Sequence, residues 1–528
     1  MRILIRGESV YDGTGAAPVA CDILTEDGFI KDIGHNIAAA GSDLTVIKGK
    51  TVCPGFIDIH RHADTAVFSS PYFGKTELLQ GITSIFSGNC GLSSVPGNHR
   101  WSGEYYQYLE PMIGRVPPDL RLDNYTSYRK CLGGHPLPVN FGFLAAAGAI
   151  KTAVKGFSKS PFSPEEMEAA QKLIRNAFEA GASGISFGLI YQPECYSGND
   201  ELITLAKTAA AFKNAILCIH IRGEGDSLPD SIEEAIRISE AANIPVNISH
   251  FKSTGIKNWR RLIYTAIEKI EAARSRGLEV TADFYPYDGG STSILSLIPP
   301  VFYKDGQNLW SVLADKNNRD SFRREINSKH PGWDNMVLGI GWERLIICSA
   351  SLPEHNSFCG KNMEAIAREQ GFADPADLLA ELTASEQGRV GIIALSMDWN
   401  DIDSVARLPW TCLVSDSLYC ASGNPHPRLN GAFPKFIREY VRERRLFSME
   451  EAVYKMTGMP AERMKLKNRG KLLPGYAADI LVFDPEKFRD NADYANSSAL
   501  ASGMDTVILN GKIVYNENEF FEPNGEVI

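Results

Sequence analysis

The middle of the chain alternates short apolar runs with longer amphipathic runs. In residues 231–242 and 258–276 apolar side chains recur every three to four positions, which is typical of a helix packed on one face. Ser163-Pro164-Glu165-Glu166 predicts the start of another helix, which Gly181 ends. The short apolar runs predict eight buried strands, at residues 55–60, 83–87, 139–143, 184–187, 215–220, 245–250, 278–283 and 411–416. Eight alternating strand and helix units predict an α/β fold with a parallel sheet closed into a (β/α)₈ barrel of the TIM type.

The two ends of the chain carry a different pattern, in which strands and turns follow each other without helices. Residues 3–10 and residues 507–514 each predict an apolar strand, a glycine turn and a second strand. Residues 22–33 and 478–483 continue the short-strand pattern. Because both ends carry the same pattern, we expect them to pair into one small sheet.

These patterns predict a division of the chain into two domains. Residues 1–54 together with residues 464–528 form the composite sheet domain, and residues 55–463 form the barrel. The stretch 288–409 is too long for a single connection, so we expect a partly helical lid between the seventh and eighth strands.

Composition and charge exclude several classes of protein. The 528 residues carry a formal charge of −10, and the 54 basic residues are scattered, so we expect no nucleic-acid partner. No run approaches 18 apolar residues and the amino terminus lacks a long apolar stretch, so we expect neither a membrane span nor secretion. The ten cysteines are dispersed without a CxxC pair, as in cytoplasmic proteins with reduced thiols.

Metal-capable side chains stand where five of the eight predicted strands end. Side chains two positions apart in an extended chain point the same way, so the two histidines of His60-Arg61-His62 can share one metal. Each residue alone also has a simpler interpretation, a histidine in a polar loop or a buried inert cysteine. Their common position at one rim of the barrel favours a metal site, and the set consists of His60, His62, Cys90, His220, His250 and Asp416.

The types of these residues indicate the metal and separate them from the other histidines. One cysteine and two histidines, with water in the remaining position, form a catalytic zinc arrangement, and a thiolate with imidazoles favours zinc over magnesium or calcium. The remaining histidines do not follow strand ends, and we expect them to be structural or on the surface: His35, His99, His135, His330, His355 and His426.

A set of motifs runs over almost the whole chain, at residues 54–62 (PGFIDIHRH), 81–83 (GIT), 88–91 (GNCG), 188–191 (GLIY), 248–252 (ISHFK), 283–287 (DFYPY), 425–429 (PHPRL) and 470–483 (GKLLPGYAADILVF). Together they resemble the amidohydrolase superfamily, specifically its N-acyl-D-amino-acid deacylase (D-aminoacylase) branch. The His-x-His strand end is common to the superfamily, whereas the GNCG cysteine and the HPR segment are specific to the branch.

The resemblance implies a distorted (β/α)₈ barrel with a small β-sandwich from both termini, and a zinc-dependent hydrolase. By the same resemblance Cys90, His220 and His250 hold one tightly bound zinc ion, while His60 and His62 with Asp416 line a second, weaker metal position. Asp416 is then the proton shuttle between the attacking water and the departing amide nitrogen. The implied reaction splits the amide bond of an N-acyl-D-amino acid into a carboxylate and a free D-amino acid.

Substrate recognition requires a group that binds a carboxylate beside the scissile amide. Arg428 follows Asp416 by 12 residues, in a loop of glycine and proline at 422–428, and a guanidinium group suits bidentate carboxylate binding. The resemblance gives this arginine the same role. It also implies further substrate contacts, although packing or surface roles remain open for Lys252 and Tyr285: Tyr191, Lys252, Tyr285 and Ser291.

One departure from the branch and two alternative functions remain. Arg61 occupies a position where threonine is commoner in the branch, and it could alter the electrostatics of the weaker metal position. Ring opening of cyclic amides such as hydantoins, or dipeptide hydrolysis, usually comes with a bridging lysine on the fourth strand, and residues 184–187 contain none. A catalytically inactive small-molecule-binding homologue would need a broken ligand set, and all six residues are present.

Overall fold

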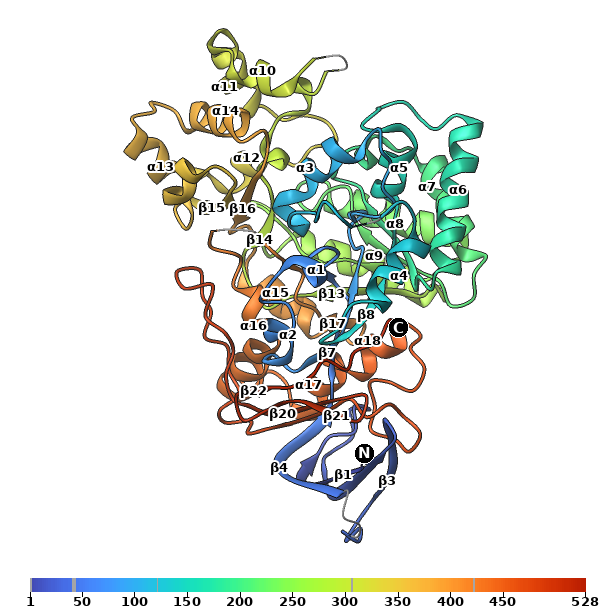
Figure 1. Cartoon of the computed structure of the whole chain (residues 1–528). Helices are drawn as coiled ribbons and strands as arrows, with labels where there is room; N and C mark the ends of the chain where they lie inside the picture. The colour runs from blue at the N-terminus through green and yellow to red at the C-terminus, as the bar shows by residue number, and fades with distance from the viewer. Residues whose placement is uncertain (1, 40–43, 121, 305–306, 421–422) are drawn as a thin grey trace.

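The computed structural model describes residues 2–39, 44–120, 122–304, 307–420 and 423–528. Its centre is a barrel of parallel strands (Figure 1). Each of the eight predicted apolar runs overlaps one strand: β5 (Phe56–Asp58), β7 (Ile82–Ser87), β8 (Asn140–Phe143), β10 (Gly184–Gly188), β11 (Ile216–His220), β12 (Val246–Ile248), β13 (Val280–Phe284) and β17 (Thr411–Leu413). The predicted (β/α)₈ barrel is confirmed.

The barrel closes through short strands that follow its first and last members. β5, β7 and β8 pair in one sheet, and β9 (Ala145–Ala146) continues β8 and pairs with β10 in a second. That second sheet runs on to β17. Closure comes from β18 (Ser417–Leu418), which pairs in parallel with β6 (Arg61–His62). The extra, offset strand pair makes the barrel irregular at this seam.

Helices follow the strands and cover the outside of the barrel. The predicted helix start is confirmed in α6 (Pro164–Glu179), where the side chain of Ser163 accepts a hydrogen bond from Glu166 N and the carboxylate of Glu166 accepts one from Ser163 N. The other helices of the barrel are α1 (Ala66–Ser69), α2 (Lys75–Leu78), α3 (Ser102–Ile113), α4 (Tyr125–Gly133), α5 (Ala147–Lys155), α7 (Asn199–Ala210), α8 (Leu228–Ala242), α9 (Leu262–Ser275), α15 (Trp399–Ala406), α16 (Arg428–Lys435), α17 (Met449–Met456) and α18 (Gly458–Arg463).

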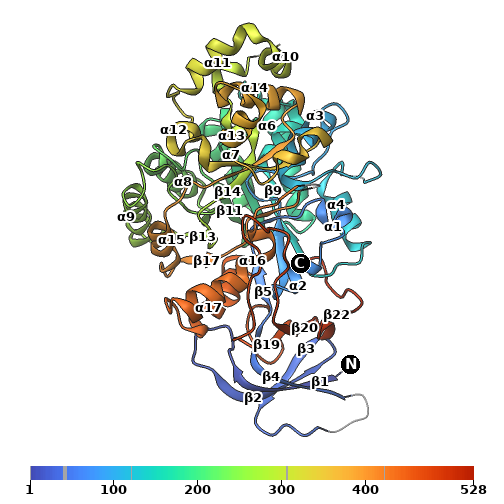
Figure 2. The same ribbon diagram turned by 90° about the vertical axis from the view of Figure 1, so that its left-hand side faces the viewer.

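Both ends of the chain contribute to one sheet at one end of the molecule (Figure 2). Its core contains side chains from both ends, among them Ile5, Ile23, Ile480 and Ile508. The strand order is β22 (Glu519–Phe520), β21 (Lys512–Asn516), β20 (Met504–Leu509), β19 (Ile480–Phe483), β4 (Leu44–Pro54), β1 (Arg2–Val10), β2 (Val19–Glu26) and β3 (Phe29–Gly34).

One of the two predicted terminal hairpins is present and the other is wrong. Asn510-Gly511 makes the expected turn between β20 and β21. At the amino terminus Gly7 makes no turn, because it pairs with Cys21 of β2 on one side and Gly49 of β4 on the other. Neighbours on both edges hold the backbone extended, so β1 is one continuous strand with a bulge after Gly7.

The segment between β13 and β17 forms a subdomain with its own core. It contains a sheet of β14 (Gly290–Ser293), β16 (Val390–Ala394) and β15 (Leu345–Ala350). Around this sheet lie α10 (Leu309–Ala314), α11 (Arg319–Ile326), α12 (Met336–Ile340), α13 (Met363–Gln370) and α14 (Pro375–Ser385). Their apolar side chains form a hydrophobic cluster separate from that of the barrel. Figures 1 and 2 place this insertion at the end of the barrel opposite the terminal sheet.

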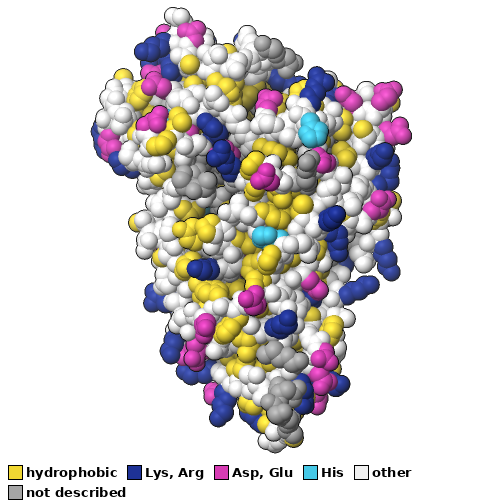
Figure 3. Space-filling view, viewed as in Figure 1, with side chains coloured by type: hydrophobic (Ala, Val, Ile, Leu, Met, Phe, Trp, Pro, Cys, Tyr) yellow, Lys and Arg dark blue, Asp and Glu magenta, His cyan; other side chains and the backbone are white. Residues whose placement is uncertain are grey.

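On the face that Figure 3 shows, basic and acidic side chains are interspersed. Among the described helices none combines the length and the apolar character needed to cross a bilayer.

The capping box of α6 yields a prediction about stability. Replacing Ser163 by alanine removes the acceptor of the Glu166 N–H group, so the free energy of unfolding should fall by about 1 kcal/mol, measured by chemical denaturation. Ser163→Asp retains an acceptor oxygen at this position and should stay within about 0.5 kcal/mol of the parent. If Ser163→Asp lowered the free energy of unfolding as much as Ser163→Ala, the acceptor oxygen at this position would not be what stabilises the helix.

Candidate metal centre and substrate pocket

The metal-capable residues predicted from the sequence meet at the carboxyl ends of the barrel strands. Each follows or ends a different strand: His60 comes after β5, Cys90 after β7, His220 ends β11, His250 follows β12, and Asp416 follows β17. His62 lies in β6, on the same side of the chain as His60. All six are buried, and the most accessible of them, Asp416, is 6% exposed.

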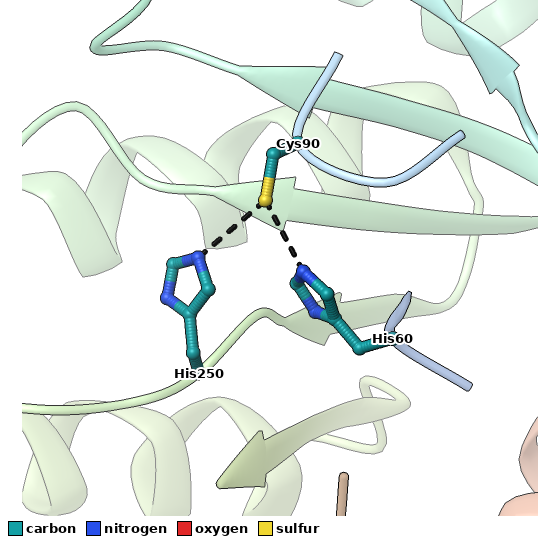
Figure 4. Close-up of side chains that lie close together, drawn as sticks. All are labelled: His60, Cys90 and His250. Carbon is teal, nitrogen blue, oxygen red and sulfur yellow. Dashed lines mark hydrogen bonds between the residues drawn. The ribbon is translucent and has the colours of Figure 1, made fainter. Parts of the chain in front are cut away.

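Cys90 lies between two of the histidines. Its Sγ is 3.3 Å from His60 Nε2 and 3.5 Å from His250 Nε2, and both rings point towards it (Figure 4). These three side chains form one group whose donor atoms are close enough together to hold a single ion.

A second group shares His60 with the first. Oδ1 of Asp416 lies 3.3 Å from His60 Nε2 and 3.4 Å from His62 Nε2, and the three residues are again close enough to hold one ion. Because one histidine belongs to both groups, the two candidate positions adjoin.

Glu224, which the sequence analysis missed, completes a third group. Its Oε1 lies 3.0 Å from His250 Nδ1 and 3.9 Å from His220 Nε2. The rings of the two histidines are 4.3 Å apart between centroids. The sequence contained a signal for this residue, because Glu224 stands four positions after the strand-ending His220, on the same rim.

Asp283 is a second residue that the sequence analysis did not assign to the site, although it lies in the predicted seventh strand. Its Oδ1 accepts a hydrogen bond from His250 N and lies 3.6 Å from His60 Nδ1. The carboxylate therefore lies behind two candidate ligands, where it orients them and compensates positive charge.

The charge states within this cluster differ. Burial opposes the charged form of His60, but Cys90, Asp416 and Asp283 hold its pKa well above the ordinary value, and burial raises the pKa of the Cys90 thiol. Burial, reinforced by nearby cationic groups, holds the pKa of His220 and of His250 well below the ordinary value, so both rings are neutral. Neutral imidazole is the form that binds metals. His220 is also buried with neither ring nitrogen hydrogen-bonded, and Nδ1 of His60 and of His62 has no hydrogen-bond partner either.

The backbone is constrained at the same positions. Cys90, His250 and Asp416 all have positive φ, of 55°, 37° and 50°, in a region that residues other than glycine rarely adopt. Gly188 of β10 packs so closely that a Cβ atom there would lie 1.8 Å from Cys90 O. Only glycine allows this approach, which fixes where the thiol points.

Four of the five predicted substrate-binding residues line a cavity of about 340 Å³ beside this cluster. Tyr191, Lys252, Tyr285 and Ser291 line it, together with Cys90 and Asp416. The hydroxyl of Tyr191 lies 3.2 Å from Thr292 Oγ1, and Ser291 donates to Ile392 O at 3.0 Å.

Arg428 lies against the cluster but not in the lining of the cavity. Its Nη1 is 2.8 Å from Asp416 Oδ2, and its guanidinium carbon lies 4.5 Å from the ring centre of Tyr285. Nε and Nη2 of Arg428 and the hydroxyl of Tyr285 are buried without a hydrogen-bond partner. His426 supports this arginine, because its Nδ1 accepts a hydrogen bond from Arg428 N while its Nε2 donates to Gly289 O. Of the loop predicted at 422–428, Ser422 lies outside the described residues.

The position of Arg61 between two histidines in the sequence suggested an effect on the electrostatics of the weaker metal position. In the structure its side chain does not face the metal-capable groups. Side chains alternate along an extended strand, so it points away from His60 and His62. Its charge is paired with Glu77, at 2.7 Å, and with Asp58, at 3.3 Å, and Tyr419 accepts a hydrogen bond from its Nε. All of these groups are buried.

Removing this buried cation should destabilise the protein. Arg61→Met leaves the carboxylates of Asp58 and Glu77 without a cation, and the free energy of unfolding should fall by about 3–5 kcal/mol in chemical denaturation. Adding Glu77→Gln removes one of the two charges and should restore part of that loss. A loss below about 1 kcal/mol in the single variant would contradict the pairing, since the expected range comes from breaking a buried ion pair.

Comparisons with known proteins agree with this architecture. Models of the amidohydrolase family match residues 51–245 and 353–515. A D-aminoacylase from Alcaligenes xylosoxydans xylosoxydans is 30% identical over 98% of this chain and 95% of its own, and an N-acyl-D-aspartate deacylase from the same organism is 29% identical over 99% and 94%.

A solved structure extends the likeness to three dimensions. The N-acyl-D-glutamate deacylase of Bordetella bronchiseptica, in complex with zinc and a phosphonate inhibitor, covers 99% of this chain and 98% of its own with a TM-score of 0.83 at 29% identity. With identity and coverage of this extent, the chain belongs to the D-aminoacylase (N-acyl-D-amino-acid deacylase) family of the amidohydrolases.

Proposed function

We propose that this protein is a zinc-dependent enzyme that hydrolyses the amide bond of N-acyl-D-amino acids, giving a carboxylate and a free D-amino acid. The observation that carries the proposal is the convergence of Cys90, four histidines and Asp416 beside a buried arginine with free donors. The first set suits a metal hydrolase, and the arginine suits the carboxylate of an amino acid. The similar deacylases support the same reaction and the same stereochemistry.

The residues present fit a zinc ion. Cys90 supplies a soft ligand, and His220 and His250 supply neutral rings, of which His220 has both nitrogens buried without partners. By the resemblance to the deacylases we assign Cys90, His220 and His250 to one tightly held ion and His60, His62 and Asp416 to a second, weaker position. In the structure Cys90 and His250 group with His60, and His220 groups with His250 and Glu224, so only the second set coincides with a group whose donor atoms are already close enough to hold one ion. Zinc bound there supplies Lewis acidity to the acyl carbonyl and acidifies the attacking water.

We assign Asp416 the movement of the proton. Burial opposes ionisation of its carboxyl group, but the charges of Arg428 and His60 hold its pKa well below the ordinary value. Asp416 is therefore a carboxylate at neutral pH and can accept a proton from water. Once protonated, it can return that proton to the departing nitrogen, which requires hydrogen-bond reach to both atoms.

Binding of the α-carboxylate falls to Arg428 and Tyr285. The guanidinium group is 1% exposed and offers Nε and Nη2, and the phenol hydroxyl also lacks a partner. Buried donors without partners are costly unless a ligand satisfies them. A substrate carboxylate satisfies both groups and places the amide beside the metal-capable cluster. Lys252, Tyr191 and Ser291 line the same cavity and complete the proposed contacts.

A cytoplasmic location is part of the proposal. All ten cysteines are free thiols, as expected in a reducing compartment. The cavity and the interspersed charge on the face that Figure 3 shows support a small-molecule substrate as the partner, in preference to nucleic acid or a membrane.

The direct test is release of free amine from paired N-acetyl-D- and N-acetyl-L-amino acids. We expect turnover of the D substrates alone, by enzyme whose zinc content has been measured, because the carboxylate site, the position of the reacting amide and the cavity for the side chain fix three substituents of Cα and so accept only one hand. Cys90→Ala should lose bound zinc and activity together. Turnover of L substrates would refute the stereochemical assignment, and a zinc-loaded enzyme inactive on every linear substrate would refute the proposed reaction.

Asp416→Asn tests the proton shuttle. Asparagine preserves the size of the side chain and one oxygen but cannot accept the proton, so kcat should fall by about 10²- to 10⁴-fold. The tightly held zinc ion, which Asp416 does not bind in this assignment, and the far-UV circular dichroism spectrum should match those of the parent protein. Normal turnover with zinc bound would show that another group moves the proton.

A further inference from the structure

One part of the cavity is lined by the titratable groups of the metal-capable cluster, and a larger part is lined by apolar side chains. We propose that the enzyme selects N-acyl-D-amino acids with large, neutral, apolar side chains, such as those of leucine, methionine and phenylalanine, over acidic ones. This inference rests on the proposed deacylation and names its substrate class. The similar proteins include deacylases of D-aspartate and D-glutamate, so overall likeness does not settle the choice.

The apolar part of the cavity comes from two regions of the chain. Met112 of α3 and Tyr196 come from the barrel loops. Leu295, Ile298, Tyr303 and Met336 come from the insertion between β13 and β17. The cavity of about 340 Å³ lies in the size range of small-molecule sites and has room for a bulky side chain. An apolar side chain gains from leaving water at such a surface.

An acidic side chain of the substrate would need a cationic group of the protein to pair with. The cationic side chains that line the cavity already have carboxylate partners. Lys252 forms an ion pair with Glu224, and its Nζ is 2.7 Å from His250 Nδ1. Arg222 forms hydrogen bonds to both carboxylate oxygens of Glu234, the nearer at 2.9 Å, and also donates to the carbonyls of Cys195 and Ser197. Among the described lining residues these are the only lysine and arginine.

Arg428 is the remaining nearby cation, and the α-carboxylate requires it. It lies beside Asp416 and Tyr285 at the reacting end of the cavity. A side-chain carboxylate would therefore compete with the carboxylate that every substrate carries.

The cavity also contains negative charge that faces an incoming side chain. Asp334 lines it, and its carboxylate accepts hydrogen bonds from Gly225 N at 2.7 Å and from the hydroxyl of Ser227. Glu224 lines it as well. A second carboxylate brought into this enclosed space meets like charge and loses its hydration, both of which are unfavourable.

The first experiment compares kcat/KM of the zinc-loaded enzyme for N-acetyl derivatives of D-leucine, D-phenylalanine, D-aspartate, D-glutamate and D-lysine. We expect the two apolar substrates to exceed the acidic ones by at least about 100-fold, because binding a substrate whose charge is left unpaired is strongly disfavoured. Equal or higher values for an acidic substrate, or for D-lysine, would overturn the inference and leave the deacylase function standing. No turnover of any D substrate would instead overturn the proposed function.

A matched pair of variants tests whether charge is the determinant. Ser296 lines the cavity and is partly exposed, and its hydroxyl donates only to Ser293 O, at 2.8 Å. Ser296→Lys adds a cation to the lining of the cavity, whereas Ser296→Met adds a neutral side chain of similar length. We expect the lysine variant to raise kcat/KM for N-acetyl-D-glutamate by about 10-fold or more, the size of effect that one new charge pair supplies, and the methionine variant to leave it unchanged.

Both variants should retain the parent zinc content, because Ser296 lies outside the metal-capable groups. If neither variant with parental zinc content gains activity on D-glutamate, the absence of a free cation is not what excludes acidic side chains, and the inference fails.

Discussion

The site depends on one closure, where the first and last strands of the barrel meet. Asp416 N donates a hydrogen bond to His60 O at 2.9 Å, and β18 continues the contact by pairing with β6. This seam joins residues more than 350 positions apart in the chain. Without it, Asp416 and Arg428 would not lie beside the histidines of the first strand. The offset strand pair that makes the barrel irregular is therefore also what assembles the candidate site.

Buried charge is balanced on both sides of this seam. On the side away from the cavity, Arg61 lies between Asp58 and Glu77. On the side of the cavity, Arg428 pairs with Asp416 and Lys252 pairs with Glu224. Charges taken out of water are tolerated when they are paired and hydrogen-bonded, and they are costly otherwise. Within the candidate site, imidazole nitrogens of three histidines, the guanidinium group of Arg428 and the hydroxyl of Tyr285 are buried without a hydrogen-bond partner, and an ion and a carboxylate can satisfy them.

The same site carries backbone strain. Cys90, His250 and Asp416 adopt left-handed backbone conformations at three separate strand ends. Each such residue costs free energy, so the surrounding structure must hold it in place. Hydrogen bonds do this for His250, through Asp283, and for Asp416, through His60 O. Rigid support of this kind aims the side chains at one point before any ligand arrives.

Local pattern was enough to predict the eight strands, the capping box of α6 and the positions of the metal-capable residues at strand ends. Those features depend on the period of apolar side chains and on residues next to each other in sequence. Only the tertiary structure decided that Glu224 and Asp283 join the cluster, that Arg61 pairs with Glu77 away from it, and that Gly7 is extended rather than turned. Each of these features depends on partners from distant segments of the chain. The direction of a side chain, its ion pairs and the pairing of a strand are set by the groups that pack against a residue and not by its neighbours in sequence.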